Sequence, residues 1–144
     1  MLITKKNQYA LRAVFELAKQ QGQGPIKVSH IAEKQSIPVR YLEVILGQLK
    51  KSGFVQSKRG YQGGYMLTVP PEKLTVGALM RFLQQDVADA ACLAPIMEKN
   101  CPFHGKCAFF PMWRRVKDAM FEVYDQTSIQ DLLNNDNGSG VYPL

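Results

Sequence analysis

The chain has 144 residues, of which 46% are hydrophobic and 21% charged, and its formal net charge is +6. This length and composition predict one globular domain with its own core and room for an appended element. No apolar run approaches the roughly 18 residues of a membrane span, and no apolar stretch follows the basic residues 1–6 as it would in a secretion signal. We therefore expect a cytoplasmic protein with no membrane partner.

Basic residues gather in the first part of the chain. Residues 1–60 contain 11 Lys or Arg against 3 Asp or Glu, whereas residues 61–144 contain 7 against 9. Positive charge concentrated on one module is typical of proteins that bind polyanions such as nucleic acids. Charge alone fits an ordinary solvated basic surface equally well, because it carries no information about the fold.

Two helices are predicted in the first 36 residues. Apolar side chains recur at helical spacing over residues 5–20, and the glycines and proline of residues 22–25 end this first helix. Ser29 is expected to cap a short second helix, which breaks near Ser36.

A third helix and a hairpin follow. Pro38 suits the first turn of a helix that carries one apolar stripe and ends at Gly53. Two β-prone runs, residues 54–59 and 65–69, flank the sequence GYQGG, which predicts a hairpin with a flexible tip. Three helices followed by a basic hairpin predict a mainly α fold, the winged helix-turn-helix.

The last part of the chain predicts further helices on either side of an irregular stretch. Thr75 is expected to cap a fourth helix, whose periodicity fades after residue 85. From Phe109 a stripe of large apolar side chains predicts a long helix, which packs either against a second copy of the chain or back on its own core. We favour the second copy, because a reader of palindromic operators needs two subunits. A short helix in SIQDLL precedes a polar tail that is not expected to pack extensively.

Exposed residues early in the third helix are the candidate base readers, because a recognition helix inserts its N-terminal half into the major groove of DNA. Arg40 could donate to guanine or to a phosphate. Glu43 could accept from a cytosine amino group, although it also fits an ordinary surface charge. Arg59 beside the hairpin tip could enter the minor groove, and three lysines could bind phosphates. The candidate DNA contacts are Ser29, Arg40, Tyr41, Glu43, Lys50, Lys51, Lys58, Arg59 and Tyr61.

All three cysteines fall within sixteen residues, at Cys92, Cys101 and Cys107. In a reducing compartment such close cysteines favour metal ligands over disulfides, and an odd number cannot all pair within one chain. An iron–sulfur cluster suits thiolate ligands, but His104 in CPFHGKC makes zinc bound by three cysteines and one histidine a competitor. Three free buried thiols are the alternative without a metal.

An enzyme is the least favoured class, and no small-molecule substrate is expected. The chain has two histidines, His30 and His104, and its sequence contains neither a nucleophile elbow nor a phosphate-binding loop. A cytosolic iron–sulfur electron-transfer protein, docking an acidic partner through the basic half, is a further alternative. It is disfavoured because an electron carrier has no use for a hairpin tip of this composition.

Several segments together resemble the Rrf2 family of bacterial transcription regulators: LITKKNQYALRAVFELA, IPVRYLEVILGQLKKSGFVQSKRGYQGGYML, LTVGALMRFL, the three cysteines and TSIQDLL. The resemblance spans nearly the whole chain. It implies a homodimeric winged-helix regulator, by expectation a repressor, that senses iron–sulfur supply, nitric oxide or redox state through a [2Fe-2S] or [4Fe-4S] cluster. It also implies cluster ligands at Cys92, Cys101 and Cys107, and base-reading residues at Arg40, Tyr41, Glu43 and Arg59.

The sequence departs from the family pattern in two places. The interval between Cys92 and Cys101 is longer than in the best-known members, so the loop must bulge, although CPFHGKC resembles the nitric-oxide-sensing branch. The usual positions of the fourth ligand hold Phe110 and Gln8 here, which leaves His104 and Gln8 as candidates. The expected division is a DNA-binding domain over 1–85, a cysteine loop over 86–108, and a dimerisation helix with its tail over 109–144.

Overall fold

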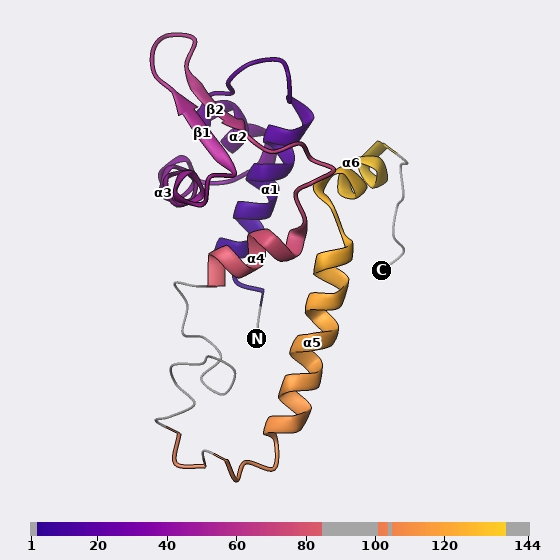
Figure 1. Ribbon diagram of the computed structural model, residues 1–144. Coiled ribbons are helices and arrows are strands. Elements are labelled where there is room, and N and C mark those ends of the chain that lie inside the picture. The colour runs from indigo at the N-terminus through magenta and orange to yellow at the C-terminus, as the bar shows by residue number, and fades with distance from the viewer. Residues whose placement is uncertain (1–2, 85–100, 104, 138–144) are drawn as a thin grey trace.

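The computed structural model describes residues 3–84, 101–103 and 105–137. These residues form six helices and one two-stranded antiparallel hairpin (Figure 1). The elements are α1 (Lys5–Lys19), α2 (Val28–Gln35), α3 (Val39–Ser52), β1 (Val55–Lys58), β2 (Gly64–Leu67), α4 (Val76–Gln84), α5 (Phe110–Gln126) and α6 (Ile129–Asn137). The predicted mainly α, winged helix-turn-helix fold is confirmed. In this described part of the chain, no helix has both the length and the apolar character needed to cross a membrane.

Helices α1, α2 and α3 pack around one apolar core, and each contributes fully buried aliphatic side chains to it. Between α2 and α3 the chain turns at Ser36, whose φ of 50° is left-handed. The Ile37 N–H closes this turn by donating to the Ala32 carbonyl oxygen at 2.9 Å. As predicted, α3 ends at Gly53, whose φ of 81° suits a residue without a Cβ. The helix-turn-helix is therefore held both by its core and by its turn.

The predicted cap of α2 at Ser29 is wrong. The N-cap residue is Lys27, and Ser29 lies inside the first turn. The reason is tertiary: the preceding Ile26 is extended and pairs with Tyr65 of the hairpin, so the helix can begin as soon as that pairing ends.

The hairpin forms the wing, defined here as residues 55–67. Its strands pair antiparallel, with Val55 opposite Leu67, and each strand is shorter than the run that predicted it. Ile26 pairs with the wing through one isolated antiparallel bridge, in which its N–H and the Tyr65 N–H each donate to the other residue's carbonyl oxygen at 2.8 Å. Val55 and Leu67 are buried in the core, so the base of the wing is fixed while its tip is exposed.

Helix α6 packs on α1 and returns the C-terminal part of the described chain to the core. Ser128 and Asp131 form a capping box at the start of α6. The Asp131 N–H donates to Ser128 Oγ at 3.0 Å, and the Ser128 N–H donates to Asp131 Oδ2 at 2.8 Å. The Ser128 N–H and, at 2.7 Å, the Ser128 hydroxyl both donate to the Asp131 carboxylate, and these two bonds lower the pKa of Asp131. Ile129 is fully buried, and Lys19 of α1 forms an ion pair with Asp136 at 2.8 Å. The polar residues 134–137, expected in the tail, therefore belong to a packed helix.

Helix α5 is long, and Figure 1 shows its N-terminal part extending away from the other helices. Its C-terminal part packs on α4, where Phe121 is buried beneath the Arg81 guanidinium. Arg81 also donates two hydrogen bonds to the Asp125 carboxylate, at 2.5 and 2.6 Å, and these lower the pKa of that carboxyl. The remainder of the apolar stripe is exposed at Met112, Trp113, Val116 and Val123. The stripe is thus divided between the chain's own core and an uncovered face.

Candidate nucleic-acid interface

The first turns of α3 present the candidate base readers on one exposed face. Arg40, Tyr41 and Glu43 are exposed, whereas Leu42 and Ile45 between and beyond them are buried in the core. The buried side of α3 fixes the helix, and the opposite side is left for a ligand. The major groove of DNA is wide enough to admit one such helix.

Two valines complete this face of α3 and are absent from the residues predicted from sequence. Val39 is 45% exposed and Val44 is 61% exposed. Apolar side chains in the major groove can contact the methyl group of thymine. Helical spacing could have found Val44, because it lies four residues after Arg40 and therefore on the same side.

The wing lies next to the start of α2 and carries three of the candidate contacts. Lys58 ends β1, and Arg59 and Tyr61 lie in the tip, where Tyr61 is 90% exposed. The Lys27 Nζ lies 4.9 Å from the centroid of the Tyr61 ring, a cation–π contact between the N-cap of α2 and the wing tip. Sequence reasoning missed Lys27, because nothing local indicates that residues 27 and 61 meet.

Ser29, Lys50 and Lys51 are the remaining candidate contacts, and all three are exposed. Ser29 lies in the first turn of α2, where backbone N–H groups and the helix dipole favour phosphate. The two lysines lie in the last turn of α3, where positive charge complements the dipole. The interface thus draws on α2, α3 and the wing, which are neighbours in the fold (Figure 1).

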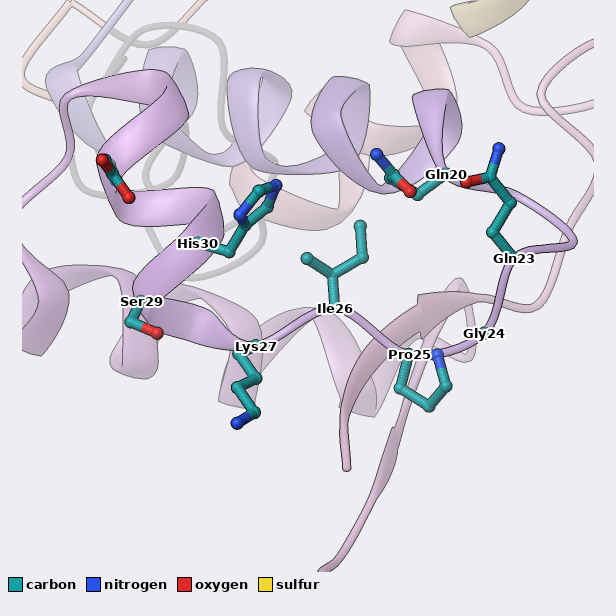
Figure 2. Close-up of a pocket in the computed structure, with 9 residues that line it drawn as sticks. Gln20, Gln23, Gly24, Pro25, Ile26, Lys27, Ser29 and His30 are labelled. Carbon is teal, nitrogen blue, oxygen red and sulfur yellow. The ribbon is translucent and has the colours of Figure 1, made fainter. Parts of the chain in front are cut away.

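A pocket of about 440 Å³ lies beside this interface, between the end of α1 and the start of α2. It is lined by Gln20, Gln23, Gly24, Pro25, Ile26, Lys27, Ser29, His30 and Glu33. Figure 2 shows Ile26 and His30 projecting towards α1, while Lys27 and Ser29 project on the opposite side of the chain. Lys27 and Ser29 therefore remain available to the outer surface.

Of the candidate metal ligands, Cys101, Cys107 and Gln8 lie within the described residues, whereas Cys92 and His104 lie outside them. Cys101 and Cys107 are partly exposed in the turns that lead into α5, and no disulfide joins these two described thiols. Gln8 is exposed on α1. The described residues alone bring no three potential ligands together. The proposed ligand set therefore remains a prediction from the sequence.

Comparison with known proteins identifies the family. The family model named Rrf2, described as an iron-dependent transcriptional regulator, matches residues 3–135. The chain belongs to the Rrf2 family. The resemblance to the family that was inferred from sequence motifs is thereby confirmed over nearly the whole chain.

Individual relatives are similar along most of their length. CymR of Bacillus subtilis, an HTH-type transcriptional regulator, is 33% identical over 138 residues, which cover 96% of this chain and 94% of that protein. IscR of Pectobacterium carotovorum is 29% identical over 135 residues, covering 94% and 80%. This protein is therefore an Rrf2-type transcription regulator, the class that the sequence favoured over an enzyme.

Solved structures of Rrf2 regulators share the fold. T. potens IscR matches with a TM-score of 0.77 at 29% identity, covering 99% of this chain and 94% of that one. The structure described as that of CymR, the global cysteine regulator of B. subtilis, matches with a TM-score of 0.74 at 32% identity, covering 94% and 98%. The winged-helix architecture thus agrees with that of known Rrf2 proteins.

Proposed function

We propose that this Rrf2 regulator binds a palindromic operator as a homodimer and acts as a repressor that responds to a metal centre at its cysteines. The DNA-binding part rests on one observation: Arg40, Tyr41 and Glu43 are exposed together on α3, beside a basic wing. Side chains can read base edges only where the scaffold presents them without covering them. The buried opposite face of α3 provides that scaffold.

Each candidate contact has a role that its chemistry suits. Arg40 would donate to guanine or to a phosphate, and Glu43 would accept from a cytosine amino group while repelling phosphates at mismatched sites. Arg59 would insert into a narrow minor groove, where the negative potential is strongest. The lysines, Ser29 and Tyr61 would contact the phosphate backbone, which adds affinity without reading sequence.

Homodimerisation is proposed through α5. Its exposed stripe of Met112, Trp113, Val116 and Val123 would be covered by the same surface of a second copy. Two subunits would place their α3 helices in successive major grooves, roughly 34–36 Å apart, which requires a palindromic operator. Light scattering should give twice the chain mass of 16.2 kDa. A mass of one chain at micromolar concentration would contradict the dimer.

The metal centre is proposed to be a [2Fe-2S] or [4Fe-4S] cluster held by Cys92, Cys101 and Cys107. Cys101 and Cys107 are partly exposed and lie close together in the sequence just before α5. Thiolates are the usual ligands of iron–sulfur clusters. The description of the family as iron-dependent supports iron over zinc. Such a cluster would supply redox chemistry at the base of the proposed dimerisation helix, with His104 or Gln8 as the candidate fourth ligand.

Anaerobic purification followed by iron, sulfide and zinc analysis tests the cofactor. Cys92→Ala, Cys101→Ala and Cys107→Ala should each abolish iron binding and visible absorption. His104→Ala should alter the absorption if His104 is the fourth ligand, and His30→Ala is its matched control, because His30 lies in α2 beside the pocket. Zinc without sulfide would instead favour a zinc-stabilised regulator.

A DNA selection experiment, run with loaded and with metal-free protein, tests the regulatory proposal. We expect a palindromic sequence to be enriched and its affinity to differ between the two forms. Colourless protein that binds the same sequences equally well with and without metal would contradict sensing, and failure to enrich any sequence would contradict operator recognition.

A further inference from the structure

A chain of polar and aromatic contacts crosses from α1 to the start of α3. It begins at Glu16, a charged residue that is only 5% exposed. A buried carboxylate is costly unless it is paired, and Glu16 Oε2 accepts a hydrogen bond from Gln35 Nε2 at 2.8 Å. Because Gln35 is the last residue of α2, this bond ties α1 to the end of α2.

Arg12, one turn earlier on α1, binds the same glutamine twice. Its Nε donates to Gln35 Oε1 at 3.3 Å, and its Nη2 donates to the Gln35 backbone carbonyl oxygen. The last carbonyls of a helix have no partner inside that helix, and this one directly precedes the left-handed Ser36. Arg12 therefore holds both the side chain and the backbone carbonyl of Gln35, the residue that leads into the turn between α2 and α3.

Tyr9 continues the contacts to the proposed reading helix. The Arg12 guanidinium carbon lies 5.7 Å from the centroid of the Tyr9 ring. The Tyr9 ring in turn packs edge-to-face against Tyr41, with centroids 5.6 Å apart and an interplanar angle of 80°. Tyr41 remains 44% exposed, so part of its ring is left for DNA.

We propose that Tyr9 and Arg12 are positioning residues for sequence reading. They hold Tyr41 and the first turn of α3 where Arg40 and Glu43 can reach the groove, without reading bases themselves. This inference rests on the proposed DNA-binding function. Because α2 and α3 are joined by one short turn, a shift of that turn moves all base-reading side chains together, and recognition tolerates displacements of only about 0.5 Å.

Variants of Tyr9 test the aromatic contact through operator and random-sequence affinities, with thermal unfolding measured alongside. Tyr9→Leu should weaken operator binding about 3- to 10-fold, the value of one aromatic pair, and leave affinity for random DNA unchanged. Tyr9→Phe retains the ring and should restore operator binding. Phe15→Leu removes a ring from another part of α1 and is the matched control. Unchanged operator affinity in Tyr9→Leu would overturn the inference and leave the proposed function intact.

A double variant of Tyr9 and Tyr41 distinguishes a positioning role of Tyr9 from a general structural role. Adding Tyr9→Leu to Tyr41→Leu should cause no further loss, because the contact is already gone; losses that multiply would overturn the inference. Without DNA, the NMR ring-current shift of the Tyr41 protons should change in Tyr9→Leu and persist in Tyr9→Phe. This measurement distinguishes a missing contact from a protein that fails to bind DNA for other reasons.

Arg12 is tested by keeping its charge. Arg12→Lys retains the cation but cannot reproduce the planar fork that reaches two acceptors, so operator affinity should fall while the dependence of binding on salt stays the same. The slope of log K against log salt concentration, called the salt slope below, measures phosphate contacts. A salt slope that falls by about 0.9 in Arg12→Gln would instead identify Arg12 as a phosphate contact and overturn its positioning role.

Discussion

Replacing Gly64 by alanine should displace the wing. Gly64 begins β2 with a φ of 155°, and a Cβ at this position would overlap the Ile26 carbonyl group and lie 2.9 Å from the Lys27 nitrogen. These neighbours are backbone atoms, which cannot rotate away as a side chain could. We therefore expect Gly64→Ala to separate the wing from Ile26.

The size of the effect follows from the contacts that would be lost. Separation breaks the two hydrogen bonds between Ile26 and Tyr65, each contributing about 0.5–1.5 kcal/mol. An alanine in a sparsely populated backbone conformation adds about 1–3 kcal/mol. The free energy of unfolding should thus fall by about 2–6 kcal/mol, and the contact between Lys27 and Tyr61 should be lost with it.

Urea denaturation at a fixed protein concentration measures this change, and Gly22→Ala is the matched control. Gly22 has a φ of 82° with open space around its missing Cβ, so this variant carries backbone strain of about 1–2 kcal/mol without any overlap. Equal stability of the two variants would refute the close approach of Gly64 to Ile26. Gly64→Ala should also bind DNA more weakly than Gly22→Ala does, because the proposed contacts at Arg59 and Tyr61 move with the wing.

Two further predictions concern acid stability and salt. Because the Arg81 hydrogen bonds lower the pKa of Asp125 below the ordinary 3.8, their stabilisation is present above that pH and is lost as the pH falls through the lowered pKa. Stability of Asp125→Asn should therefore decline less steeply than that of the wild type below about pH 4, as measured by acid unfolding; parallel curves would argue against the link between α4 and α5. Lys50→Gln and Lys51→Gln should each reduce the salt slope of operator binding by about 0.9 without changing the selected bases. Glu43→Gln is the contrasting variant, which should change the selected bases, and a lysine variant with an unaltered slope would remove that residue from the interface.

Most helices and the wing were predictable because their signals are local. Apolar spacing marked α1 and α3, Gly53 marked an end, and GYQGG marked the hairpin. The cap of α2 was not predictable from Ser29, since the start of that helix depends on pairing between Ile26 and the wing. The extension of α6 was also missed, because its polar residues are held by packing on α1 and not by their own apolar pattern.

The candidate site was predictable in part for the same reason. Arg40, Tyr41 and Glu43 could be chosen from their place in a helix-turn-helix, and they are exposed as such a role requires. The contacts that support them could not be chosen, because Tyr9 read as one member of an apolar stripe and Arg12 as one of many basic residues. Their partners lie more than twenty residues away along the chain.

The sequence by itself determined the family, the order of the elements and the face of each helix that is apolar, since these depend on neighbouring residues and on motifs. Tertiary structure alone decided what each face meets: Phe121 enters the core while Val123 of the same helix stays exposed, and Lys27 meets Tyr61. The physical reason is that side-chain periodicity encodes direction around a helix axis, whereas the partner in that direction depends on how the whole chain packs.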